Sequence, residues 1–437
     1  MKVSRVMLSL VLIGMMAIGW TMLFVSNAEE KAQIASYMVS GDDYMQKCLY
    51  QKAIMAYENT LSHEETKEAR DKWIQAYQAS YEDGTATKKQ YKNALIAAAQ
   101  IYTEDMSYWE KAIALDLDQN NYVGAYATYK EASKAEARSE LLYEYEKRIL
   151  YSYTVGHRGY KQFSRNLQGY YTVYDGMGWG VLNPNGTNMY DCIYTYISPL
   201  DSSLNGVFCS KEKGARFMDK KGVIHFHLPN EYEKALAYAS GYVPVYVEDA
   251  WHFLECKTGN IGETGYEQVT VFSNNVAFVK QNQTWMLIDI QGNKVSEQVF
   301  DDVKCYGNGM YTANDIIVAS QNGKYGFYNS VGESRNAFTC KDADVYYGSA
   351  VAYQDESGKW GFVSVDGDIV IKPAFKKAKS FSGGLAAVYN GEKWGFINQK
   401  GELVIDYQFV DADYFTTQGA CMVSTYEGSY QMLSLRF

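Results

Sequence analysis

The chain has few residues of several kinds, and each scarcity excludes a class of protein. Only 5 of its 437 residues are proline, whereas aromatic residues make up 15%. Disordered segments are rich in proline and poor in aromatic residues, so this composition predicts an ordered, packed chain. The net charge is −10, which is the opposite of the basic surface that nucleic-acid binding requires. We therefore expect no nucleic-acid partner.

Patterns typical of metal sites and catalysis are also missing. The 7 cysteines contain no C-x-x-C pair, and their scatter does not suggest a disulfide framework. His225 and His227 share one face of a strand, but no cysteine or carboxylate at ligand spacing accompanies them, which favours a surface or packing role. The sequence contains no phosphate-binding loop and no hydrolase motif. We therefore expect no catalytic residue, no metal and no cofactor.

One segment resembles a calcium loop at its start. It opens with Asp116 and continues to Asn120, with two aspartates in alternate positions. Its sixth residue is Asn121 where the calcium loop has glycine, and its twelfth is Ala127 where that loop has glutamate. The pattern therefore favours a turn between two helices.

A long apolar run lies near the N-terminus. Residues 6–25 carry no charge, and their length is enough to span the core of a bilayer. Basic residues precede the run and two glutamates follow it, which predicts a cytoplasmic stretch 1–5 and an extracytoplasmic bulk. We predict a retained transmembrane helix over 6–25, with the protein located at a bacterial cell membrane. A signal peptide cleaved near Ser26 to Ala28 is the alternative.

Residues 29–153 are predicted to be helical, because they contain no proline and are rich in alanine, tyrosine, glutamate and lysine. Small and aromatic residues recur there at positions that let paired helices approach each other. The positions are Gly41, Tyr44, Tyr50, Ala53 and Tyr57, then Tyr91, Ala94 and Ala98, then Trp109, Tyr122, Ala125, Tyr129 and Ala132. The region is similar to tetratricopeptide repeats, with about three hairpins and a closing helix from Ala135 to Tyr153. An irregular helical stalk is the alternative.

The rest of the chain repeats one pattern with a period of about 35 residues. Residues 358–401 contain the sequence Lys-Trp-Gly-Phe twice, so that Trp360 and Trp394 are 34 positions apart. An apolar residue follows two positions after each such aromatic residue, and in most units a glycine follows after seven. We call this recurring position the aromatic slot. It is occupied by Trp179, Trp251, Trp285, Tyr325, Trp360, Trp394 and Tyr430, and in one unit by Ala215.

Each unit is predicted to form three or four short strands. Trp394, Phe396 and Asn398 alternate with Gly395 and Ile397, which is the period of a strand. A glycine within a strand marks a close approach of another group, and we interpret the neighbouring aromatic ring as that group. The unit that contains the slot residue Tyr325 is the longest, because residues 306–315 form an insertion.

These motifs resemble the WG-repeat family, which is named for its Trp-Gly pair. The resemblance covers about residues 156–437 and is closest in the last two units, whereas Trp251-His252 and Trp285-Met286 depart from it. It implies a β-repeat domain and supplies no active-site residues. Eight units predict a closed β-propeller, in which a segment near 149–155 completes the last unit. An open β-solenoid is the alternative. The whole chain is thus a multidomain α and β protein.

Two classes of function remain. Repeat surfaces bind partners without a catalytic constellation, so we expect an extracytoplasmic binding or scaffold protein. Its partner is expected to be a protein, with a cell-wall glycan as another ligand class. The alternative is an enzyme that acts on a glycan or peptide in a central cavity, which needs two inward carboxylates about 5–10 Å apart. The candidate acids fit ordinary loop positions, which favours binding; they are Asp301, Asp302, Asp411 and Asp413.

Overall fold

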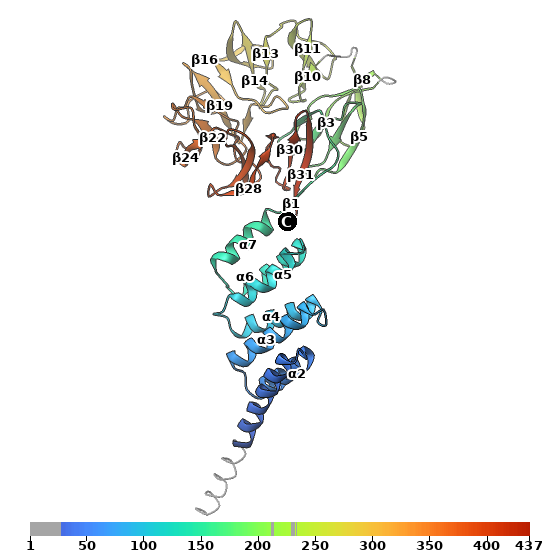
Figure 1. The fold of residues 1–437 in the computed structure, drawn as a ribbon. Coiled ribbons are helices and arrows are strands. Elements are labelled where there is room, and N and C mark those ends of the chain that lie inside the picture. The colour runs from blue at the N-terminus through green and yellow to red at the C-terminus, as the bar shows by residue number, and fades with distance from the viewer. Residues whose placement is uncertain (1–27, 211–213, 229–231, 233) are drawn as a thin grey trace, which may run out of the picture. The chain divides into compact units, whose positions relative to one another are not determined.

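The computed structural model describes residues 28–210, 214–228, 232 and 234–437 (Figure 1). The chain divides into two compact units, and the division falls between Leu150 and Tyr151. We call them the helical unit and the β unit. The apolar run predicted to cross the membrane, 6–25, lies outside the described residues. Of the helices within the described ranges, none combines the length and the apolar character that a membrane span requires.

The described part of the helical unit contains seven helices, and successive helices pack on one another. Threonine caps begin two of them: Thr66 accepts a hydrogen bond from Ala69 N, and Thr87 forms a capping box with Gln90. The helices are residues 28–46, α2 (Tyr50–His63), α3 (Lys67–Glu82), α4 (Lys88–Ile101), α5 (Ser107–Leu117), α6 (Tyr122–Lys134) and α7 (Glu140–Leu150).

Small residues let these helices pack closely, as the sequence predicts. Gly41 is buried at a position where a Cβ would overlap with the Tyr57 ring, and that ring is itself only 1% exposed. The Tyr57 hydroxyl donates a 2.7 Å hydrogen bond to Asp42. The closing helix is shorter than predicted: it begins at Glu140, because Ser139 accepts a hydrogen bond from Leu142 N and so caps the new helix.

The segment that resembles a calcium loop is a turn between α5 and α6. Asp116 lies at the end of α5 and is 1% exposed. Burial opposes ionisation of this carboxyl, but hydrogen bonds from Lys88, Lys92 and Asn121 hold its pKa below the usual range. Its oxygens are therefore already paired with basic groups of the protein.

The β unit is an eight-bladed β-propeller (Figure 1). Most blades contain four antiparallel strands, and we number them in chain order. Blade 1 contains β2 (Gln162–Arg165), β3 (Tyr171–Tyr174), β4 (Trp179–Leu182) and β5 (Asn188–Tyr194). Blade 2 contains β6 (Tyr196–Ile197), β7 (Gly206–Ser210), β8 (Gly214–Met218) and β9 (Ile224–His227). Blade 3 contains β10 (Lys234–Ala235), β11 (Tyr242–Val247) and β12 (Ala250–Glu255). Blade 4 contains β13 (Gln268–Val269), β14 (Val276–Gln281), β15 (Thr284–Asp289) and β16 (Lys294–Phe300).

The second half of the ring contains blades 5 to 8, and in blade 5 the strand β19 pairs with all three other strands. Blade 5 contains β17 (Asp302–Val303), β18 (Thr312–Ala313), β19 (Ile316–Gln321) and β20 (Lys324–Tyr328). Blade 6 contains β21 (Asp342–Ala343), β22 (Val351–Gln354), β23 (Trp360–Val363) and β24 (Ile369–Phe375). Blade 7 contains β25 (Lys377–Ala378), β26 (Leu385–Tyr389), β27 (Trp394–Asn398) and β28 (Leu403–Phe409). Blade 8 contains β29 (Asp411–Ala412), β30 (Ala420–Tyr426), β31 (Ser429–Leu435) and β1 (Tyr153–Val155).

The ring is closed by strands from both ends of the β unit. β1 pairs antiparallel with β31, and Thr154 lies opposite Ser434. Gly156 N donates a 2.8 Å hydrogen bond to Met432 O next to this pair. The prediction that a segment near 149–155 completes the last unit is therefore confirmed, and the structure has the closed propeller instead of the open solenoid. Because β1 is held by β31, residues 151–155 belong to the β unit.

The glycine of the Trp-Gly pair faces a backbone carbonyl, so our interpretation that an aromatic ring fills this space was wrong. A Cβ on Gly361 would lie 2.6 Å from Ile371 O, and one on Gly395 would lie 2.8 Å from Ile405 O. These oxygens belong to the outermost strand of each blade, where the register shifts at a bulge. In blade 4, Met286 takes the place of the glycine and pairs directly with the outermost strand. The glycine therefore makes room for the bulge.

Candidate functional site

The aromatic slot lies on the third strand of each blade, except in blade 5, where it lies on β20, the fourth strand in chain order and the partner of β19. Trp285 and Trp394 are buried, with exposed fractions of 4% and 9%. Trp394 packs against Tyr389 of the preceding strand, with ring centroids 5.3 Å apart, and Trp179 does the same with its neighbour in blade 1. The half-buried slot residues are Trp179, Trp251, Tyr325, Trp360 and Tyr430. A structural role for the slot stays a prediction.

The carboxylates that the sequence offered as a catalytic pair each have a local role. Asp302 and Asp411 accept hydrogen bonds from the slot tyrosines of their own blades. Asp301 accepts a hydrogen bond from Gly323 N in the turn between β19 and β20. Asp413 is buried, and burial raises its pKa even though Arg165 lies near it. Asp301 therefore contacts a turn, Asp302 and Asp411 contact a neighbouring strand, and Asp413 lies in the core.

The insertion of blade 5 runs through the centre of the ring. Asn308 is fully buried, and its backbone oxygen accepts a 3.1 Å hydrogen bond from Ala237 N in blade 3. Gly307 O accepts one of 2.9 Å from Ser164 in blade 1, and Gly309 O accepts one of 2.9 Å from Val271 N in blade 4. Blades 1 and 5 are opposite each other in a ring of eight. A segment that belongs to one and bonds to the other must therefore cross the axis.

A buried arginine fills another part of the centre. Arg165 of blade 1 donates to the backbone oxygens of Tyr414 and Phe415 in blade 8, at 2.7 and 2.9 Å. It also donates to Ser382 in blade 7 at 3.3 Å, and its guanidinium lies 4.6 Å from the ring centroid of Tyr347 in blade 6. One side chain thus connects four blades.

Three buried polar atoms in this cluster have no hydrogen-bond partner among the described protein atoms. They are Arg165 Nε, Tyr171 Oη and Asp413 Oδ2. The second carboxylate of the cluster, Asp344, accepts hydrogen bonds from the Tyr414 hydroxyl at 2.7 and 2.8 Å. The buried Asp413 and the half-buried Asp344 therefore lie beside arginine and tyrosine side chains.

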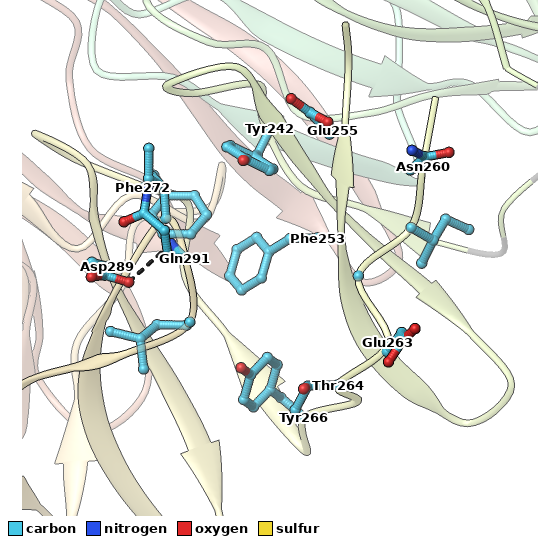
Figure 2. A pocket seen from close by; sticks show the side chains of 15 residues that line it. Tyr242, Phe253, Glu255, Asn260, Glu263, Thr264, Tyr266, Phe272, Asp289 and Gln291 are labelled. Atoms are coloured by element: carbon cyan, nitrogen blue, oxygen red, sulfur yellow. Dashed lines mark hydrogen bonds between the residues drawn. The ribbon is translucent and has the colours of Figure 1, made fainter. Parts of the chain in front are cut away.

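A pocket of about 300 Å³ lies between blades 3 and 4 (Figure 2). Blade 3 lacks a regular fourth strand, and the chain after β12 touches the blade at two isolated bridges, Leu254 to Ile261 and Trp251 to Tyr266. Between these bridges the segment 262–265 forms one rim of the pocket. The other rim is the turn after β15, where Asp289 accepts a 2.9 Å hydrogen bond from Gln291 N (Figure 2).

Four aromatic rings form a connected series along the pocket. Phe253 and Phe272 have ring centroids 4.5 Å apart, Tyr242 and Phe272 5.3 Å, and Phe253 and Tyr266 6.1 Å. Phe253, Tyr266 and Phe272 are buried, with 4–9% of their surface exposed. They form an apolar floor that polar groups surround.

The polar groups around this floor are acidic or neutral. Glu255, Glu263 and Asp289 contribute three carboxylates, and none of the 15 lining residues is lysine, arginine or histidine. The Thr258 hydroxyl donates a 2.7 Å hydrogen bond to Glu255. Hydrogen bonds from the backbone of Asn293 hold the pKa of Asp289 below its usual range. The formal charge of the pocket lining is therefore negative, and we call it the anionic pocket.

A second pocket, of about 390 Å³, lies between blades 6 and 7 and has no charged residue in its lining. It is lined by Tyr346, Ser349, Ala350, Ser364, Val365, Val370, Phe381 and Gln399. It differs in this respect from the pocket between blades 3 and 4, whose lining contains three carboxylates.

Sequence reasoning assigned none of the residues that line the anionic pocket to a binding site. They come from two blades, and no local motif joins them. One signal was present: the third unit has its turn glycine one position late, at Gly259, and Gly262 and Gly265 follow within its outer segment. Such irregular spacing marks a blade whose outer strand departs from the repeat.

The remaining candidates for a metal site give no cluster. His225 lies 3.2 Å from Asp219, and His227 lies opposite Arg216 in the sheet. Among the residues that the structure describes, no three histidine, cysteine or acidic side chains are grouped in a way that holds a metal ion. Cys48 and Cys305 are exposed free thiols.

Comparison with known proteins gives one family. The WG containing repeat family matches residues 179–207, 264–285, 285–325, 360–394 and 394–426. No curated protein matches the chain.

Three solved structures are similar to parts of the chain at low identity. PorZ of Porphyromonas gingivalis, described as a surface component of the type-IX secretion system, is 8% identical with a TM-score of 0.32, and the match covers 66% of this chain and 39% of PorZ. The Pan2 WD40 domain of Neurospora crassa is 10% identical with a TM-score of 0.35, over 64% and 90% of the two chains. The Sgt2 TPR domain of Aspergillus fumigatus is 20% identical with a TM-score of 0.20, over 27% and 76%. The matched segments between residues 179 and 426 are WG containing repeats, and they lie in blades of the propeller.

Proposed function

We propose that this protein is a membrane-anchored scaffold that binds partner proteins through its repeat surfaces and catalyses no reaction. A repeat propeller suggests such a role, because its faces and outer wall offer large surfaces that bind without a catalytic constellation. The helical unit adds a second array of repeats with its own surface.

One observation carries the proposal: a segment of the chain crosses the axis of the ring. The insertion of blade 5 crosses the centre, where Asn308 is fully buried. Asp413 is buried near Arg165, and Asp344 accepts a hydrogen bond from the Tyr414 hydroxyl. An enzyme that used a central cavity would need two accessible carboxylates there. The arrangement therefore supports binding on the outside of the ring over chemistry inside it.

The proposed location is the outer side of a bacterial cell membrane. It rests on the charge-free run 6–25 and the basic residues before it. A glycan of the cell wall is the second class of ligand that such a location would offer.

The test is photo-cross-linking of the full-length protein in cells. Benzoylphenylalanine replaces Val123 on the helical unit or Met177 on the propeller, which are 72% and 91% exposed. Covalent adducts of defined mass from either position identify a protein partner and support the proposal. If the adducts contain only glycan, the ligand is a glycan and not a protein. If the purified protein instead hydrolyses a glycan or peptide, and Asp413→Asn abolishes the activity without unfolding the propeller, the scaffold proposal fails.

A further inference from the structure

We infer that the pocket between blades 3 and 4 binds an arginine side chain of a partner protein. The inference rests on the proposed scaffold function and names the chemistry that one of its surfaces recognises. Three features of the pocket lead to it: its charge, its aromatic floor and its size.

The charge of the pocket is unbalanced. Glu263 is exposed on the rim, and no ion pair to it, to Glu255 or to Asp289 occurs within the described parts of the chain. The nearest basic residues in the sequence, Lys257 and Lys294, are exposed and do not line the pocket. Figure 2 shows Phe253 in the middle of the lining side chains with the carboxylates around it. A cation placed on that ring would therefore have acidic groups on several sides.

The aromatic floor lacks the cation that other rings of this protein have. Arg165 lies 4.6 Å from the Tyr347 centroid, Lys304 lies 4.5 Å from that of Tyr325, and Lys234 lies 5.2 Å from that of Tyr246. In the described residues, the lysines and arginines that stack on aromatic rings do so outside this pocket. The face of an aromatic ring attracts cations, and the attraction is strongest away from water. A partially enclosed floor of four rings offers that environment.

Arginine fits these features better than lysine. Its planar guanidinium stacks on aromatic rings and presents several donors to carboxylates at the same time. The volume of about 300 Å³ is enough for one long side chain and too small for a folded element. An arginine that projects from a partner's surface would place its guanidinium over Phe253 and direct its donors toward Glu255 and Glu263.

The experiment uses methyl NMR of the full-length protein, because Ile261, Ile288 and Ile290 line the pocket. Isoleucine methyl groups are labelled with carbon-13, and N-acetyl-arginine amide is titrated as the probe. We expect saturable shifts at these three methyl groups and none at Ile371 and Ile405 of blades 6 and 7. The neutral isostere N-acetyl-citrulline amide should bind at least about tenfold more weakly, since it lacks the charge that a carboxylate recognises.

Matched variants test the carboxylates. Glu255→Gln combined with Glu263→Gln should abolish saturation, whereas Glu297→Gln, an exposed acid on β16 of blade 4, should leave it unchanged. Equal binding of the arginine and citrulline probes, or no shift at the three methyl groups, overturns the inference. Free arginine binding far more tightly than the capped form also overturns it, because the ligand is then a small molecule.

A partner that still cross-links to the double variant leaves the scaffold proposal standing and removes this pocket from it. Saturable arginine binding without any cross-linked partner supports the pocket and contradicts the scaffold.

Discussion

The hydroxyl of Tyr430 donates a 2.8 Å hydrogen bond to Asp411, the first residue of the innermost strand in the same blade. Tyr325 makes the same contact with Asp302 in blade 5, at 2.6 Å. In blade 7 the slot residue is Trp394, which has no hydroxyl and lies beneath the Lys379 ammonium at 5.5 Å. The slot residue therefore contacts the inner strand or the residue just after it through a tyrosine–carboxylate bond, through a stacked cation or, at Tyr325, through both.

Replacing Tyr430 by phenylalanine should weaken the propeller most at moderate pH. Burial and the bond to Asp411 raise the pKa of Tyr430 to about 12, above the usual value of about 10. A raised pKa contributes stability that is complete below pH 10 and is lost as the pH rises through 12. Tyr430→Phe should therefore lower the free energy of unfolding by about 1 kcal/mol at pH 8. Its stability should also fall less than that of the wild type between pH 10 and 12, as measured by urea unfolding. If the free energy of unfolding of the two proteins falls equally between pH 10 and 12, this account is contradicted.

Gly395→Ala should destabilise blade 7 by about 2 kcal/mol or more, since a Cβ would lie 2.8 Å from the Ile405 carbonyl and the backbone must shift. The matched control is Gly326→Ala in blade 5, where the nearest atom, Phe338 O, is 3.3 Å away and no comparable shift is required. Thermal unfolding of both variants measures the difference. If the two lose the same stability, the bulged carbonyl is not the reason for the glycine.

Repetition within the chain made the ring predictable. Each unit carries the signals of its own strands, so the number of blades and the closing role of residues 149–155 could be derived from the period and from the incomplete last unit. The group that faces Gly361 was not predictable in the same way. It is a carbonyl of the next strand, and its approach depends on a bulge whose register no local pattern reveals.

The path of the insertion across the axis and the residues of the anionic pocket could also not be predicted from the sequence. The insertion at 306–315 was visible as extra length, but its path through the centre depends on hydrogen bonds to blades 1, 3 and 4. Glu255 and Asp289 are 34 positions apart and reach one pocket because two neighbouring blades place them there. Such contacts follow from the closed ring and not from any motif.

Trp394→Ala should lower the stability of the β unit by about 3–5 kcal/mol, the usual effect of truncating a buried large aromatic residue. The side chain is 9% exposed and packs against Tyr389. Met177→Ala, at a position that is 91% exposed, is the control and should have little effect. Chemical unfolding followed by circular dichroism measures both. Unchanged stability together with loss of a cross-linked partner would identify the slot as a ligand contact.

A disulfide between strands β1 and β31 should stabilise the closed ring. Thr154→Cys and Ser434→Cys place thiols at positions that are direct partners in the register. Joining the two ends of the β unit restricts the unfolded chain, and we expect a gain of about 2–4 kcal/mol in the oxidised form over the reduced form. Unfolding in the presence and absence of a reductant provides the comparison. Thr154→Cys alone, which cannot form this bond, is the control and should show no difference between the two conditions.

Arg165→Met should destabilise the propeller by about 3–5 kcal/mol, because it removes one of the two cations near the buried carboxyl of Asp413, the other being Lys379. It also removes the hydrogen bonds to Tyr414 O and Phe415 O and the stacking on the Tyr347 ring. The control is Arg335→Met, which removes an exposed ion pair with Asp315 and should cost less than about 1 kcal/mol.

A double-mutant cycle with Asp413→Asn separates the contribution of the charge pair from that of the other contacts. If Asp413→Asn restores most of the stability lost in Arg165→Met, the guanidinium chiefly compensates a buried acid. If it restores none, Arg165 acts by holding the backbone of blade 8 to blade 1. Urea unfolding of the four proteins decides between these outcomes, and an Arg165→Met protein as stable as the wild type would contradict both.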